Sequence, residues 1–169
     1  DMKEEDKAKL YHMIGLGALK YFIIKVDPKK TMLFNPKESI DFNGNTGPFI
    51  QYTHARIRSI LRKAAEKGIE YAASPMPKVE LSAKEIRLIK LMNTFPAKIA
   101  EGAQAYSPAV IANYAYDLAK EFNQYYHDTP ILKEENEDVL KMSLVLIDTL
   151  SAVLRKAMGI LGIELPERM

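Results

Sequence analysis

A chain of 169 residues, 47% hydrophobic and 27% charged, has the composition of one globular domain, or of one domain that carries part of a neighbour. It contains no cysteine, which excludes disulfides and thiolate metal sites, and no apolar run near the roughly 20 residues of a membrane span. The net charge of +2 gives no general excess of cations, so any nucleic-acid site has to be local. The charged first residues, DMKEEDKAK, lack the apolar core of a secretory signal, and we expect a cytoplasmic protein with no membrane partner.

The N-terminal quarter of the chain differs from the rest in its pattern of apolar runs and turn residues. Apolar residues recur at helical spacing over residues 4–19 and predict a helix there. The next stretch, YFIIKV at 21–26, fits either a short strand or a continuation of that helix, because so short an apolar run has no diagnostic period. The Asn43-Gly44-Asn45 turn predicts a boundary between one unit over residues 1–43 and a second over residues 44–169.

Helix signals are clear from residue 46 onward. Thr46 is the expected N-cap of a helix, and Pro48 suits its first turn, where a missing backbone donor costs nothing. Gly68 should end this helix after about residue 67. The stretch AASPMP at 72–77 contains two prolines and predicts a linker.

Four further helices are expected after the linker. Ser82 and Glu85 form a capping box that begins the first, and the second runs from about residue 95 to 106. Ser107-Pro108 repeats the cap-then-proline signal and begins a third, which ends near residue 126. The last, over about 136–161, is apolar on nearly every side, so it belongs in the middle of a bundle, and Gly162 should stop it. The predicted fold class is all-α, an up-and-down bundle of about five helices with a short N-terminal stub.

The helix over residues 46–67 carries a polar stripe beside its apolar face. Its core face should consist of Ile50, Thr53, Ile57, Ile60, Leu61 and Ala64. A second line holds Tyr52, Arg56, Ser59 and Lys63, and a third line beside it holds Gln51, Arg58 and Arg62. Cations that meet phosphates and a ring on which an unpaired base can stack suit RNA. The plainer interpretation is a solvated basic helix face or a surface that docks onto protein.

Several segments in order resemble one family. GNTGPFIQYTHARIRSILRKA is similar to the junction between the class I catalytic domain and the helical DALR anticodon-binding domain of arginyl-tRNA synthetases. IGLGALKYFIIKV resembles the end of that catalytic domain, and LAKEFNQYYHDTPIL and GILGIELPERM resemble the anticodon domain and its chain end. The resemblance covers nearly the whole chain and implies the C-terminal, tRNA-binding part of such an enzyme.

The resemblance also implies roles for particular residues. In this family the Tyr and Arg of the QYxHxR segment contact tRNA, and here these are Tyr52 and Arg56. Phe49 stands where Tyr is usual, so it keeps a stacking face and loses a hydroxyl. Tyr126 and Met169 match positions that pack against anticodon-loop bases, although from the residues alone packing inside the bundle is the more natural role of Tyr126. With Lys63 and neighbouring cations on the backbone, the expected partner is an arginine-specific tRNA.

The chemistry of aminoacylation is missing from these 169 residues. Signatures of the HIGH and KMSKS type are absent, as is a glycine-rich phosphate loop. His12, His54 and His127 have no carboxylate at metal spacing and are not expected to be ligands. The resemblance implies a parent enzyme, an arginine–tRNA ligase, whose missing catalytic domain binds ATP, Mg²⁺ and arginine, while this fragment is expected to be an inactive monomer without a cofactor. The alternatives are a structural or protein-interaction bundle and the anticodon domain of a related class I synthetase.

Overall fold

The structure, a computed structural model, describes residues 3–71 and 78–169. In these residues the regular elements are all helical: α1 (Glu4–Ile24), α2 (Pro36–Ser39), α3 (Gly47–Glu66), α4 (Ala83–Asn93), α5 (Phe95–Ala105), α6 (Ala109–Asp128), the short 3-10 helix η1 (Ile131–Lys133) and α7 (Glu137–Ile160). The prediction of an all-α bundle is confirmed. The predicted linker at 72–77 lies outside the described residues. Of the helices described, none has both the length and the apolar character that crossing a bilayer demands.

The ends of the helices follow the predicted signals with one exception. The Thr46 hydroxyl accepts from the Phe49 amide at 3.2 Å, and Ser82 begins α4 with both halves of its capping box. Gly68 and Gly162 end α3 and α7 at φ values of 72° and 65°, which glycine adopts without strain. The predicted cap at Ser107 is wrong. Its hydroxyl instead donates to a carboxylate oxygen of Asp27 at 3.1 Å, and α6 begins without a side-chain cap.

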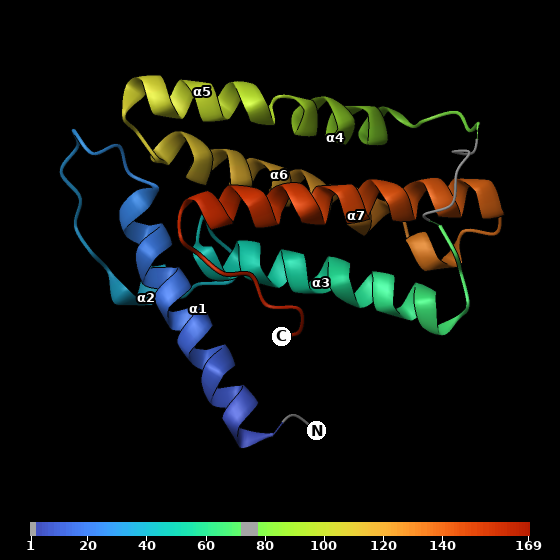
Figure 1. Cartoon of the computed structure of the whole chain (residues 1–169), viewed down its shortest axis with the longest axis horizontal. Helices are drawn as coiled ribbons and strands as arrows, with labels where there is room; N and C mark the ends of the chain where they lie inside the picture. The colour runs from blue at the N-terminus through green and yellow to red at the C-terminus, as the bar shows by residue number, and fades with distance from the viewer. Residues whose placement is uncertain (1–2, 72–77) are drawn as a thin grey trace.

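The bundle is built around α6 and α7. Figure 1 shows α4 and α5 following one another along one side, α7 between them and α3, and α1 crossing obliquely near the start of α3. Helix α6 packs against α3, α4, α5 and α7, while α7 packs against α3, α4 and α6. The predicted core face of α3 is confirmed, since all six of its residues are buried. The central position of α7 is confirmed as well, because its buried residues face three other helices.

Helix α1 is longer than the predicted helix. YFIIKV continues it through Ile24, because Tyr21 and Phe22 are buried against the bundle. The Tyr21 hydroxyl lies 2.6 Å from Asn45 Oδ1 and 2.9 Å from the Ala112 carbonyl oxygen, which ties α1 to the loop before α3 and to α6. Glycines permit the close crossing of α1 over α3: a Cβ on Gly47 would lie 2.7 Å from the Gly17 carbonyl oxygen.

Candidate nucleic-acid interface

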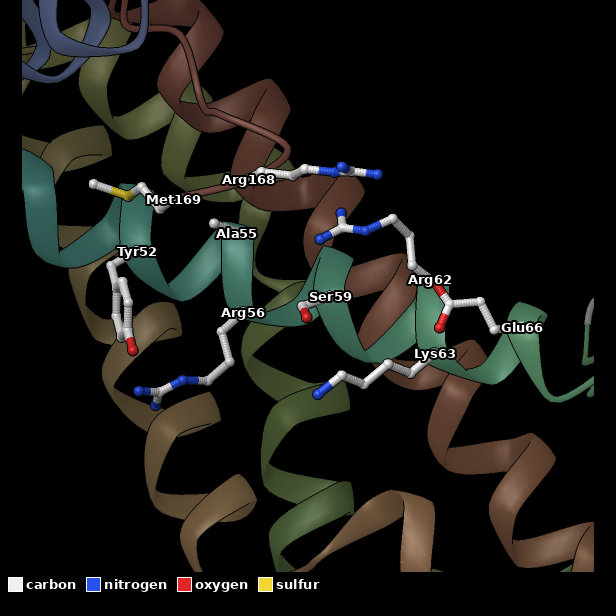
Figure 2. Close-up of a pocket in the computed structure, with 9 residues that line it drawn as sticks. All are labelled: Tyr52, Ala55, Arg56, Ser59, Arg62, Lys63, Glu66, Arg168 and Met169. Atoms are coloured by element: carbon white, nitrogen blue, oxygen red, sulfur yellow. The ribbon is translucent and has the colours of Figure 1, made fainter. Parts of the chain in front are cut away.

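The predicted stripe on α3 faces away from the core. The Thr46 cap and the buried apolar residues set the rotation of the helix, so Tyr52 and Lys63 are exposed and Arg56 is half-buried. Figure 2 shows the side chains of Tyr52, Arg56 and Lys63 pointing to the same side of α3. This arrangement leaves the stripe available to another molecule.

Arg56 lies over the rings of two aromatic residues. Its guanidinium carbon lies 4.8 Å from the centroid of the Tyr52 ring and 5.6 Å from that of Tyr126. Nη1 donates to Asn123 Oδ1 at 2.7 Å, and the Asn123 amide in turn donates to Thr53 Oγ1 at 2.8 Å. Arg56 is therefore already paired with side chains of the protein itself. The reason is that α6 brings Asn123 and Tyr126 against α3, which fixes the guanidinium before any ligand arrives.

A basic cleft of about 490 Å³ lies beside this stack (Figure 2). It is lined by Tyr52, Ala55, Arg56, Ser59, Arg62, Lys63, Glu66, Arg168 and Met169. Four of these side chains are cationic and one is acidic, so the cleft favours an anionic ligand. Phosphates of a nucleic acid fit its charge, and the Tyr52 ring at its edge offers a surface for a base.

An apolar cleft of about 560 Å³ shares Tyr52 with the basic cleft. It is lined by Leu10, Tyr11, Ile14, Phe42, Asn43, Phe49, Tyr52, Thr53, Arg56, Asn123 and Met169. Phe49 faces this cleft and packs against Tyr116, with ring centroids 5.4 Å apart. The sequence patterns did not indicate four residues that line the clefts: Tyr11, Phe42, Asn123 and Arg168. Asn123 precedes Tyr126 by one helical turn in the quoted FNQYY segment, whereas the other three reach the clefts only through tertiary packing.

The structure thus places the predicted residues unequally. Tyr52, Arg56 and Met169 line both clefts, Lys63 lines the basic cleft and Phe49 lines the apolar cleft. Tyr126 lines neither cleft. It is half-buried and stacks on Phe122, with centroids 5.9 Å apart and an angle of 15° between the ring planes, so the bundle already uses one face of its ring. Its contact with the site is made through Arg56.

The third line of α3 is not a free surface, because the protein itself pairs all three of its side chains. Gln51 is fully buried, and its amide donates to the Met13 carbonyl of α1 at 3.2 Å and to the Glu164 carbonyl at 3.0 Å. Arg58 and Arg62 both bond to Glu167. The physical reason is that the segment after α7 turns back and lies along α3. This docking brings Met169 to the clefts.

His54 holds the same segment. Its ring is fully buried, and Nδ1–H donates to the Pro166 carbonyl at 3.0 Å. Burial lowers the pKa of His54, while the Pro166 carbonyl and the Glu167 carboxylate act in the opposite direction with smaller effect. The side chain is therefore a neutral hydrogen-bond donor to the segment after α7 rather than a metal ligand. Within residues 3–71 and 78–169, no cluster of three or more His, Cys, Asp or Glu side chains could hold a metal ion.

We expect the stability of the domain to fall as the pH drops below about 6.5. The unfolded chain binds a proton at His54 near that pH, whereas the folded state resists it, so the contribution is fully present above 6.5 and is lost as pH falls towards the lower folded pKa. The variant His54→Asn keeps an amide donor for Pro166 and does not titrate. Urea unfolding at pH 7.5 and 5.5 should show a smaller loss for this variant than for the wild type or for the control His127→Asn. Equal losses in all three proteins would contradict the assignment.

Comparison with known proteins identifies the class. The model of the DALR anticodon binding domain matches residues 50–169, and the chain belongs to this family. Along the whole chain it is similar to arginine–tRNA ligases: that of Bacteroides fragilis is 56% identical over 168 residues, and that of Porphyromonas gingivalis (strain W83) is 50% identical over 169. The match covers 99% and 100% of this chain and 28% of each relative. The chain therefore spans little more than a quarter of the length of these relatives.

Solved structures agree with this assignment. The arginyl-tRNA synthetase of Thermus thermophilus superimposes on 100% of this chain with a TM-score of 0.87 and 32% identity. That of Plasmodium falciparum superimposes on 95% of the chain with a TM-score of 0.79 and 25% identity. The chain covers 28% of each of these structures. The resemblance stated from the sequence is confirmed.

Proposed function

We propose that this chain is the tRNA anticodon-binding part of an arginine–tRNA ligase. The observation that carries the proposal is the stack of Tyr52, Arg56 and Tyr126 at the edge of the basic cleft, in a chain of the DALR family. Bases of an anticodon loop are unpaired, and proteins recognise such bases by stacking them on aromatic rings and guanidinium planes. The preformed arrangement lowers the entropic cost of binding, because the Arg56 side chain is already ordered.

The two clefts divide the task between them. Cations of the basic cleft hold the phosphate backbone, with Lys63 as the exposed contact and Arg56 as the ordered one. Tyr52 and Met169, which line both clefts, provide apolar surfaces against which bases of the loop pack. Phe49 and Phe42 extend this surface into the apolar cleft. Tyr126 contributes mainly by supporting Arg56, since the bundle occupies one face of its ring.

We propose that the catalytic activity belongs to the part of the relatives' length that this chain does not span. There we place the sites for ATP, Mg²⁺ and arginine, and we expect residues 1–169 by themselves to have no ligase activity and to bind no cofactor. We propose residues 1–43 as the end of the catalytic domain and residues 44–169 as the anticodon-binding domain. Leu16, Leu19 and Ile23 of α1 are exposed apolar side chains, which the catalytic domain would cover. We also propose that the protein is a monomer located in the cytoplasm.

Measuring the association constant K for an arginine tRNA at several salt concentrations tests the proposal. It also distinguishes RNA binding from a surface that docks onto another protein. Two to four phosphate contacts on single-stranded RNA should give a slope of log K against log salt of about −1.5 to −3. Replacing Lys63 with Gln should make the slope less steep by about 0.7, because one phosphate contact is lost. Lys67→Gln is the matched control, since Lys67 is an exposed cation at the end of α3 that lines neither cleft.

The outcomes are distinguishable. Absence of binding to any tRNA would overturn the proposal and leave a protein-interaction bundle. Binding with a preference for a tRNA other than an arginine-specific one, in competition among purified tRNAs, would assign the chain to a related class I synthetase. Equal salt slopes for Lys63→Gln and Lys67→Gln would show that the phosphate contacts lie outside the basic cleft.

A further inference from the structure

The last eight residues of the chain form a docked tail. We use this name for residues 162–169, which turn back after α7 and run along α3 (Figure 1). Ile163 and Pro166 are buried, and the Glu164 and Pro166 carbonyls accept hydrogen bonds from Gln51 and His54 of α3. The tail is therefore attached to the bundle over most of its length, and its final residue reaches both clefts.

Glu167 is the most connected residue of the docked tail. Its Oε2 accepts from Arg58 Nε at 2.7 Å, and its Oε1 accepts from Arg155 Nη2 at 3.0 Å. Its backbone carbonyl accepts from Arg62 Nη1 at 2.8 Å. Arg58 belongs to α3 and Arg155 to α7, so one carboxylate joins two helices to the tail. Arg58 is also held by Asp148 of α7, at 3.3 Å, which fixes its guanidinium.

The attachment of Glu167 limits where Met169 can lie. Two residues span at most about 7 Å of chain, so with Glu167 held on α3 and α7 the Met169 side chain stays close to Tyr52 and Arg56. Without this attachment the end of the tail would move among many conformations, and most of them would leave the clefts empty. Neither Arg58 nor Arg155 lines the two clefts.

We propose that Glu167, Arg58 and Arg155 are positioning residues that hold Met169 in the clefts and thereby raise the affinity for RNA without contacting it. This inference rests on the proposed function. It makes a prediction of unusual sign: removing the Glu167 carboxylate takes a negative charge away from an RNA-binding surface, which by charge alone would strengthen binding. If Arg58 and Arg155 were phosphate contacts held in check by Glu167, its removal would free them and binding would also tighten. Positioning of Met169 requires the opposite, a weaker complex.

A double-mutant cycle on the full-length protein tests this. The dissociation constant for an arginine tRNA is measured at one salt concentration for the wild type, Glu167→Ala, Met169→Ala and the double variant. We expect each single change to raise Kd about tenfold, the loss typical of one apolar anchor. The double variant should bind no more weakly than Met169→Ala alone, because Glu167 acts through Met169. Glu164→Ala is the matched control: its side chain is on the same tail, and only its backbone carbonyl bonds to α3.

Each outcome decides between the alternatives. Unchanged or tighter binding by Glu167→Ala, or effects of the two changes that multiply in the double variant, would overturn the inference while the proposed function stands. Failure of the wild type to bind tRNA would instead remove the proposed function, and the inference with it. If thermal unfolding shows that Glu167→Ala is misfolded, Glu167→Gln, which keeps hydrogen-bonding oxygen and loses the charge, replaces it in the same cycle.

Discussion

Replacing Tyr52 with alanine should weaken binding of an arginine tRNA roughly 5-fold to 150-fold, the equivalent of about 1 to 3 kcal/mol for one base stacked on an aromatic ring. The effect is large because Tyr52 has two functions. Its exposed ring borders both clefts, and it covers the guanidinium of Arg56 at 4.8 Å. Loss of the ring removes a surface for a base and also frees Arg56 on one side.

Tyr106→Ala is the matched control for this change. Tyr106 is 89% exposed, at the junction of α5 and α6, and lines neither cleft, so its removal should leave tRNA binding unchanged. Equilibrium titration of a labelled tRNA, with each variant checked for folding by circular dichroism, gives the comparison.

Tyr126→Ala should also weaken binding, and it should lower the melting temperature as well, because its ring stacks on Phe122. If Tyr52→Ala and Tyr126→Ala both bind like the wild type, the assignment of the interface is wrong.

Replacing Gly47 with alanine should destabilise the protein by about 1 to 3 kcal/mol, the usual cost of overpacking a tight contact. The added Cβ would lie 2.7 Å from the Gly17 carbonyl oxygen and 3.1 Å from Tyr21 Cβ, and the first of these is backbone that no rotamer change can move. Helix α1 would have to shift away from α3. Urea unfolding measures the loss of stability. Relative to the wild type, amide hydrogen exchange should speed up more in α1 than in α7.

Gly15→Ala provides the control, because it makes the same chemical change within α1. Apart from the neighbouring residues and backbone of α1 itself, no atom lies within 4 Å of the Cβ that it adds, so it should stabilise the protein by roughly 0.5 to 1 kcal/mol through the helix propensity of alanine. A neutral Gly47→Ala would show that the crossing of α1 and α3 is looser than the structure indicates, and a destabilising Gly15→Ala would contradict the open space that the structure shows around that position.

Some features of the molecule could be predicted because they depend on neighbours in the sequence. Thr46, Gly68 and Gly162 act on backbone groups within four residues of themselves, so the ends of α3 and α7 were accessible from local pattern. The core face of α3 followed from the helical period in the same way. The stretch YFIIKV could not be assigned, because its helical form depends on burial of Tyr21 against α6 and the loop before α3.

The same distinction between local sequence and tertiary packing applies to the candidate site. Local sequence determined that Tyr52, Arg56 and Lys63 share one exposed side of α3, since their spacing alone decides it. Only the tertiary structure decided that Arg56 is held between Tyr52 and Tyr126 and that Arg58 and Arg62 serve the docked tail. The physical reason is that helical periodicity specifies which residues leave the core, whereas the partner of each exposed charge is chosen by elements distant in the chain.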